Sequence, residues 1–189
     1  MPATSVQKLA RVLKVLVTIT FICNLIALAL VPGLALMKGF QPLLDLTPYE
    51  RGWEVPVRVL LLFLMCWRWV WTSGAYEVVL ALFLLFCGGC TAVILWQGRR
   101  VLGTVLTGSP FRAENGVSLR RAAVCCFLIS AAALVRLLWG FWYYASIAPL
   151  LTYNALFIPI FFMGGLLCLV MSALFRQAAE LKAENDLTI

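Results

Sequence analysis

Four long apolar runs divide the chain, and each is nearly free of charge. They cover Val15–Leu36, Val78–Trp96, Ala122–Ser146 and Ala155–Phe175. Each run has about 19 to 25 residues, and a helix needs about 20 to cross the hydrocarbon of a bilayer. The runs lack the alternating pattern of a barrel strand, so helices that satisfy their own backbone in lipid are expected. The pattern predicts an all-α integral membrane protein, one transmembrane domain built as a four-helix bundle.

A fifth apolar stretch, Pro56–Thr72, interrupts the simple pattern. Its length of about 17 residues is at the lower limit for a span. The stretch contains Arg58 and Arg68, and its end carries three tryptophans, Trp67, Trp69 and Trp71. Tryptophan rings favour the headgroup level, where the indole N–H stays wet. We interpret this stretch as an additional outer interfacial or re-entrant helix, which leaves four spans.

The distribution of Lys and Arg predicts the orientation of these spans. With four spans, ten of the 15 Lys and Arg residues fall on one side, with both termini, and four fall in the outer connection. Such an excess is the positive-inside pattern of a protein whose termini are cytoplasmic. The formal charge of +7 therefore reflects topology, and we expect the lipid bilayer as partner and no direct nucleic acid binding. The first apolar run exceeds the usual 7–15 residues, roughly, of a signal peptide, so we expect an uncleaved signal-anchor.

Small residues at regular spacing predict how two of the spans pack. They form one stripe in the third span and one in the fourth, with Gly165 beside the second stripe: Ala122, Cys126 and Ser130, then Gly164, Cys168 and Ser172. In lipid, small residues mark the faces on which helices approach closely. Because the connection between these spans is short, we expect an antiparallel hairpin.

Catalytic chemistry finds little support in the residues. The chain has no histidine, which removes the commonest metal ligand and the commonest general base. We therefore expect no enzyme, no metal and no cofactor. Cys87 and Cys90 have C-x-x-C spacing, so a membrane thiol–disulfide oxidoreductase is the third hypothesis for function. Their place near the middle of a span argues against contact with a protein substrate outside the membrane.

Three polar residues of the spans form a candidate intramembrane site. Arg136 is ionisable and lies within a span, and such a residue is a functional-site hypothesis by default. Glu77 at the outer mouth of the second span is a candidate ion-pair partner, and the Asn24 amide needs a partner among its neighbours. A structural clamp is one interpretation. A small transporter or channel-like subunit built around Arg136 is the alternative hypothesis for function.

Polar sequence complexity concentrates in the connection between the second and third spans and in the tail, residues 176–189. Candidate partner-binding residues in these segments are Pro110, Phe111, Arg112, Glu114, Asn115, Arg120, Arg121, Asn185, Asp186, Leu187 and Ile189. We expect Ser118 to cap the third helix and Asn185–Asp186 to end a helical tail. We also expect Leu187–Ile189 to dock near Pro110 and Phe111.

Two segments carry a resemblance to a known family. The sequences TGSPFRAEN, followed by SLRRAA, and LFRQAAELKAENDLTI resemble an uncharacterised family of small bacterial membrane proteins, a domain of unknown function. The resemblance covers the second to fourth spans and the tail, and the first span loosely, without the Trp-rich stretch. Family genes commonly lie beside a Cro/CI-like helix-turn-helix regulator. The resemblance thus implies a bacterial inner-membrane protein that sequesters or signals to a cytoplasmic transcription factor, with homo-oligomers left open.

Overall fold

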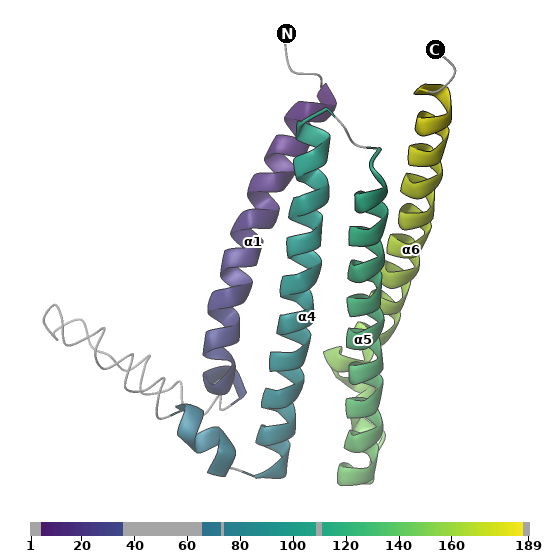
Figure 1. Cartoon of the computed structure of the whole chain (residues 1–189). Coiled ribbons are helices and arrows are strands. Elements are labelled where there is room, and N and C mark those ends of the chain that lie inside the picture. Colours follow the sequence, from purple (N-terminus) through teal and green to yellow (C-terminus); the bar gives the residue numbers. More distant parts are fainter. Residues whose placement is uncertain (1–4, 36–65, 73, 109–110, 187–189) are drawn as a thin grey trace, which may run out of the picture. The chain divides into compact units, whose positions relative to one another are not determined.

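The computed structural model describes residues 5–35, 66–72, 74–108 and 111–186. Four long helices account for most of them: α1 Ser5–Ala35, α4 Ala75–Leu106, α5 Ala113–Tyr144 and α6 Tyr153–Asp186 (Figure 1). The short 3₁₀ helix η2 covers Ala148–Leu151, and residues 66–72 are also helical. The described residues contain no strand. Each long helix is apolar and long enough to cross a membrane, which confirms the prediction of an all-α protein with four candidate spans.

Two of the predicted helix boundaries differ from those observed. α5 begins at Ala113 with Arg112 in extended conformation as its N-cap, so the prediction that Ser118 caps this helix is wrong. Ser118 instead lies buried inside α5. The helix ends at Tyr144, before the predicted limit, because Ala145 adopts the left-handed conformation with φ of 44°. The tail is helical through Asp186, the last residue that the structure describes, so the prediction that Asn185–Asp186 end this helix stays a prediction.

The chain divides into two compact units, and α1 and α4 each contribute to both. Residues 25–88 form the smaller unit, in which Val31, Val70 and Ala81 are buried together. At Gly88 of this unit, an added Cβ would lie 2.6 Å from Leu28 Cδ2. The missing side chain therefore lets α1 and α4 approach closely, as expected for a glycine on a helix contact face.

The Trp-rich stretch belongs to the smaller unit where the structure describes it. Residues 66–72 form a short helix that exposes Trp69 and Trp71 and buries Val70. The rest of the predicted interfacial segment, residues 56–65, lies outside the described residues. Whether residues 56–72 cross the membrane therefore stays a prediction.

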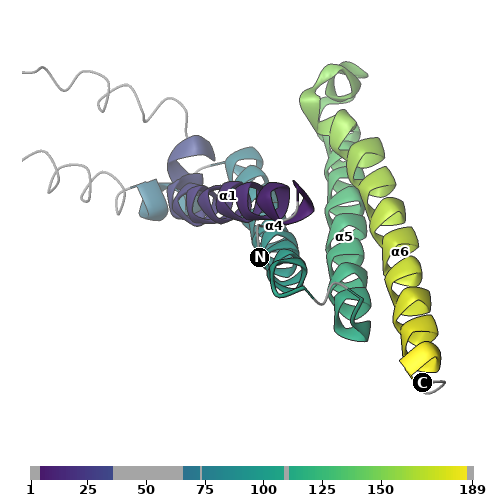
Figure 2. The same ribbon diagram turned by 90° about the horizontal axis from the view of Figure 1, so that it is seen from above.

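In the larger unit, residues 1–24 and 89–189, α5 and α6 form an antiparallel hairpin joined through η2. The two helices lie side by side in both views of the ribbon (Figures 1 and 2). At the turn, an added Cβ on Gly140 would lie 3.2 Å from the Pro149 ring. Farther along, the Ser130 hydroxyl donates a hydrogen bond of 2.9 Å to the Ile158 carbonyl. The predicted hairpin is confirmed.

The small-residue stripe on α5 is buried as predicted, at Ala122, Cys126 and Ser130. On α6 the close contact belongs to Gly165, where an added Cβ would lie 2.8 Å from Cε1 of Phe127. At Gly164 an added Cβ meets nothing within 4 Å, so the tightest approach on α6 lies one residue beyond the start of the predicted stripe. The other two residues of that stripe do contact α5, since Cys168 shares a hydrogen bond with Cys126 and Ser172 with the Gly116 carbonyl.

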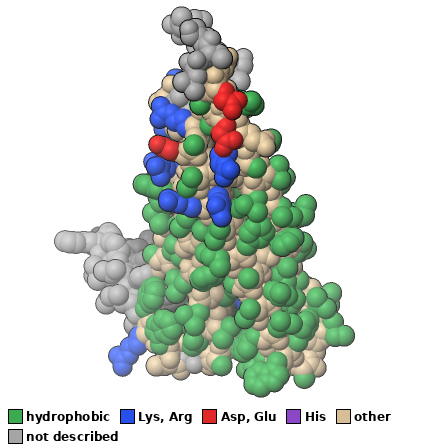
Figure 3. Space-filling view, turned by 45° about the vertical axis from the view of Figure 1, so that its right-hand side comes forward, with side chains coloured by type: hydrophobic (Ala, Val, Ile, Leu, Met, Phe, Trp, Pro, Cys, Tyr) green, Lys and Arg blue, Asp and Glu red, His purple; other side chains and the backbone are tan. Residues whose placement is uncertain are grey.

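Large apolar side chains cover the outward faces of α1, α5 and α6 and are exposed in the isolated chain. Examples include Leu16, Val135 and Leu167. Soluble monomers rarely expose contiguous apolar patches larger than a few hundred Å², roughly. In Figure 3, where α6 comes forward, hydrophobic side chains cover most of the face and charged ones gather near one end. This surface fits contact with a lipid bilayer.

Candidate functional site at the basic end

The larger unit has a basic end, which we define as the starts of α1 and α5 together with the ends of α4 and α6. Its cations are Lys8, Arg11, Lys14, Arg99, Arg100, Arg112, Arg120, Arg121, Arg176 and Lys182. Lys, Arg and acidic side chains gather in this region of Figure 3, beyond the apolar part of the surface. Nearly all candidate partner-binding residues belong to this end, although they come from segments far apart in the sequence.

A side-chain hydrogen bond holds the end of α4 beside the start of α5. Asn115 Nδ2 donates to Thr104 Oγ1 over 2.7 Å. The Asn115 N–H also bonds to the Arg112 carbonyl at 3.0 Å, which closes the first turn of α5. Only 2% of Asn115 is exposed. This candidate residue therefore holds the connection in place and is not available on the surface.

A second set of contacts joins the start of α5 to α6. The Ser172 hydroxyl donates a 2.7 Å hydrogen bond to the Gly116 carbonyl. An added Cβ on Gly116 would lie only 3.1 Å from the Ser172 carbonyl oxygen, so glycine permits this close approach. The Phe111 and Phe175 rings also pack together, with 6.2 Å between their centroids. The connection is thus attached to both α4 and α6.

The side chains of most of the remaining described candidates are exposed to solvent. Phe111 is 52% exposed although it packs on Phe175. The other exposed candidates are Arg112, Glu114, Arg120, Arg121 and Asn185. Asp186 is the last residue of α6. Pro110 and Leu187–Ile189 lie outside the described residues, so the predicted docking of the tail stays a prediction.

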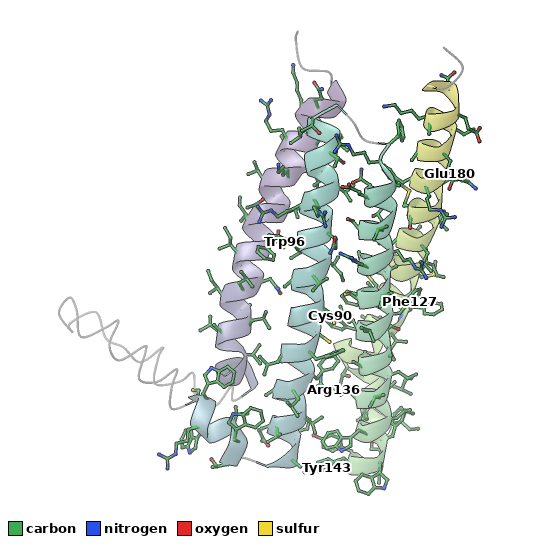
Figure 4. All side chains as sticks on the ribbon, viewed as in Figure 1. Cys90, Trp96, Phe127, Arg136, Tyr143 and Glu180 are labelled. Atoms are coloured by element: carbon green, nitrogen blue, oxygen red, sulfur yellow. The ribbon has the colours of Figure 1, made fainter. Side chains whose placement is uncertain are left out.

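α6 continues well past its contact with the connection. From Phe175 to Asp186 the helix advances about 16 Å at 1.5 Å per residue. Arg176 Nε lies 3.5 Å from Glu180 Oε1, which is an i,i+4 ion pair on this extension. Figure 4 labels Glu180 on α6. Both side chains are mostly exposed, so the pair adds little stability. The extension presents a charged helix beyond the apolar segment.

The candidate intramembrane residues are divided between the two units. Arg136, labelled on α5 in Figure 4, is half-buried in the larger unit, as is Asn24 of α1. Glu77 lies in the first turn of α4, in the smaller unit. An ion pair between Arg136 and Glu77 stays a prediction, and so does a transport site built on these residues.

Two thiol pairs link the helices of the larger unit. Cys90 of α4 shares a side-chain hydrogen bond with Cys125 of α5, and Cys126 shares one with Cys168 of α6. The sequence spacing had paired Cys90 with Cys87, a buried residue of the smaller unit. Residues 90 and 125 lie on different helices, so local spacing contained no signal for their contact. Among the described residues, no group of three or more His, Cys, Asp or Glu is arranged to hold a metal ion.

Comparison with known proteins gives one match. Searches of curated proteins and of solved structures found nothing similar. A family model described as "Protein of unknown function (DUF2975)" matches residues 67–189. The match covers α4 to α6 and starts within the Trp-rich helix, which the resemblance had left unassigned, whereas α1 lies outside it. Because the match spans well over half of the chain, this protein belongs to the DUF2975 family, whose function is unknown.

Proposed function

We propose that this protein is a membrane-embedded regulatory partner that holds a cytoplasmic helix-turn-helix transcription factor away from its operator. The observation that favours this proposal most is the exposed surface around Phe111 at the basic end, which hydrogen bonds hold in a fixed position. The hydrogen bonds of Asn115 and Ser172 attach this surface to α4 and α6. Such preorganisation lowers the ordering cost of binding a protein partner.

The chemistry of the surface suits a protein partner. Phe111 is exposed over half of its area and is flanked by Arg112 and, two residues further, by Glu114. Aromatic and arginine side chains are enriched among the residues that dominate binding energy at protein interfaces. An aromatic side chain partly supported by Phe175 keeps its position and still offers a face to a partner.

The extension of α6 supports the sequestration mechanism. Beyond Arg176 it carries three acidic residues, Glu180, Glu184 and Asp186, against the single cation Lys182. Helix-turn-helix domains meet the DNA phosphates with basic side chains. An acidic helix that covers this basic surface competes with the operator directly. Phe111 anchors the regulator in this mechanism, and the extension blocks its DNA-binding face.

The proposal places the protein in a bacterial inner membrane with both termini in the cytoplasm. The described residues contain four candidate spans, and with residues 56–72 taken as the outer interfacial segment these spans leave the start of α1 and the end of α6 on the same side. Most Lys and Arg residues accompany these termini, as the positive-inside rule requires for a cytoplasmic location. Reporter fusions after Trp96 and after Tyr153 are expected to report opposite sides of the membrane. A fusion after Trp96 that reports the outer side would refute this orientation, and fusions that report the same side would refute the crossing of α5.

Measurement of regulator binding to the membrane protein tests the regulatory role. The full-length protein in nanodiscs is titrated with a Cro/CI-like helix-turn-helix regulator, the class of partner that this proposal names. We expect binding in the micromolar range or tighter, and loss of about tenfold in affinity for Phe111→Ala, as for an aromatic hot spot. The matched control is Trp142→Ala, which removes an exposed aromatic side chain near the other end of α5.

A second variant separates anchoring from competition with DNA. Glu180→Lys combined with Glu184→Lys reverses the charge of the α6 extension. We expect this double variant to release operator DNA binding by the regulator even where Phe111 still anchors it. Absence of regulator binding at micromolar concentration, or equal losses for Phe111→Ala and Trp142→Ala, would refute the proposal.

A further inference from the structure

Three cationic side chains from two helices converge on one cavity at the basic end. The cavity has a volume of about 290 Å³ and is lined by Lys14 of α1 and by Trp96, Arg99, Arg100 and Gly103 of α4. All five residues belong to the larger unit. No acidic residue occurs in this lining. Three like charges held together in this way repel one another, and a bound anion removes that cost.

Aromatic contacts hold one of the cations in place. The Arg99 guanidinium carbon lies 5.7 Å from the centre of the Phe21 ring and 5.6 Å from that of Trp96. These two rings also contact each other, with 5.9 Å between centroids. Contact with a ring uses the face of the guanidinium and leaves its N–H groups in the plane for an acceptor. Arg99 is therefore oriented without being neutralised.

Gly103 keeps the cavity open beside the lysine. An added Cβ at Gly103 would lie 3.8 Å from Lys14 Nζ, an ordinary contact distance. A larger side chain at this position extends into the space between the helices. Substitution of Gly103 thus offers a way to fill the cavity while every cation is retained.

We infer that this cavity binds a phosphate ester, namely the headgroup of an anionic phospholipid. Arginine and lysine side chains are the usual partners of phosphate oxygens, and arginine can bind two of them at once. Basic pockets between membrane helices bind anionic lipid headgroups in this way. The volume is at the lower end of the range for small-ligand sites, about 300–1,000 Å³, and suits a headgroup.

The surroundings favour a lipid over a soluble phosphate ester. Trp96 is 52% exposed beside the cations, as expected for a ring at the headgroup level. Exposed apolar side chains occur deeper along both helices, away from the basic end, such as Leu16 on α1 and Val93 on α4. Acyl chains of a bound lipid can lie against these side chains, whereas a soluble ligand gains nothing from them.

Lipid binding to the purified full-length protein tests this inference. Native mass spectrometry of the protein in a neutral detergent measures retention of phosphatidylglycerol against phosphatidylcholine. We expect phosphatidylglycerol to bind preferentially, with an affinity about fivefold weaker for each of Lys14→Gln, Arg99→Gln and Arg100→Gln. Gly103→Leu should abolish the preference without any loss of charge. Arg112→Gln is the matched control, because it removes one cation of the same end that does not line the cavity.

The outcomes separate the possible sources of the bound phosphate. Lys14→Arg keeps the charge and should retain the preference, which shows that a loss in Lys14→Gln is not a folding defect. Glycerol 3-phosphate and inorganic phosphate are added in parallel, and binding of either as tightly as phosphatidylglycerol would overturn the lipid assignment. Equal effects of Arg112→Gln and Arg100→Gln, or an unaltered preference in Gly103→Leu, would overturn the cavity as the site.

Discussion

Two neighbouring glycines on α6 allow a sharp test of how the α5–α6 hairpin packs. An added Cβ at Gly165 would lie 2.8 Å from Cε1 and 3.0 Å from Cζ of Phe127. At Gly164 the same atom meets nothing within 4 Å. Gly165→Ala and Gly164→Ala therefore introduce the same methyl group on one helix, against a ring in the first variant and into open space in the second.

The expected loss of stability in Gly165→Ala depends on how far the Phe127 ring can move away from the added methyl group. Its ring packs edge-on against Phe162 with 5.6 Å between centroids, so it cannot retreat freely. Overpacking of this kind typically costs about 1–3 kcal/mol. The gain in helix propensity from Gly to Ala, about 1 kcal/mol, is common to both variants and cancels in the comparison. We expect the free energy of unfolding of Gly165→Ala to lie about 1–3 kcal/mol below that of Gly164→Ala.

Reversible unfolding in mixed detergent micelles, or steric trapping in bicelles, measures this difference. The same pair of variants is then made in a Phe127→Leu background, where the ring atoms that collide are absent. In that background the penalty at Gly165 should largely disappear, which appears as a coupling energy in the double-mutant cycle. Equal stabilities of the two alanine variants within about 0.5 kcal/mol, or an unchanged penalty in the Phe127→Leu background, would refute the packing argument.

Further predictions concern polar groups and thiols of the larger unit. Ser172→Ala removes the hydrogen bond to the Gly116 carbonyl and should lower the free energy of unfolding by about 0.6 kcal/mol in the same assay, the average for such bonds between membrane helices; a more stable variant would contradict this. Gln97 Oε1 is buried without a hydrogen-bond partner in the described part of the chain, so Gln97→Met should raise that free energy by about 1 kcal/mol. A loss of stability would show that the amide has a partner. In a protein that keeps only Cys90 and Cys125, copper–phenanthroline should cross-link α4 to α5, as seen by gel mobility after proteolysis of the connection; failure to cross-link at any oxidant concentration would contradict their contact.

Local composition and hydrophobic period were enough to predict the number and approximate position of the membrane-spanning helices. Hydrocarbon accepts a backbone only when its amides are paired internally, so four apolar runs of sufficient length predict four helices. All four occur in the structure, and the tail is helical through Asp186, the last described residue. The buried stripe of α5 was also predictable, because small residues mark contact faces in lipid whichever helix lies opposite. These features depend only on local composition and period.

Tertiary structure decided the rotation and the partners of each helix. The tightest approach of α6 to α5 is at Gly165 and not at Gly164, because Phe127 lies opposite Gly165 and the apolar residues all around α6 carry no signal for this difference. Cys90 contacts Cys125 on another helix, a pairing that no local spacing encodes.

The start of α5 and the basic cavity were decided in the same way. Thr104 binds the Asn115 side chain across the connection, so α5 begins before the Ser118 cap that the sequence suggested. Lys14 and Arg99 share a cavity only because α1 and α4 lie side by side there. Hydrophobic period determines that a helix forms and crosses the membrane. The shapes of the facing side chains determine which residues of two helices meet.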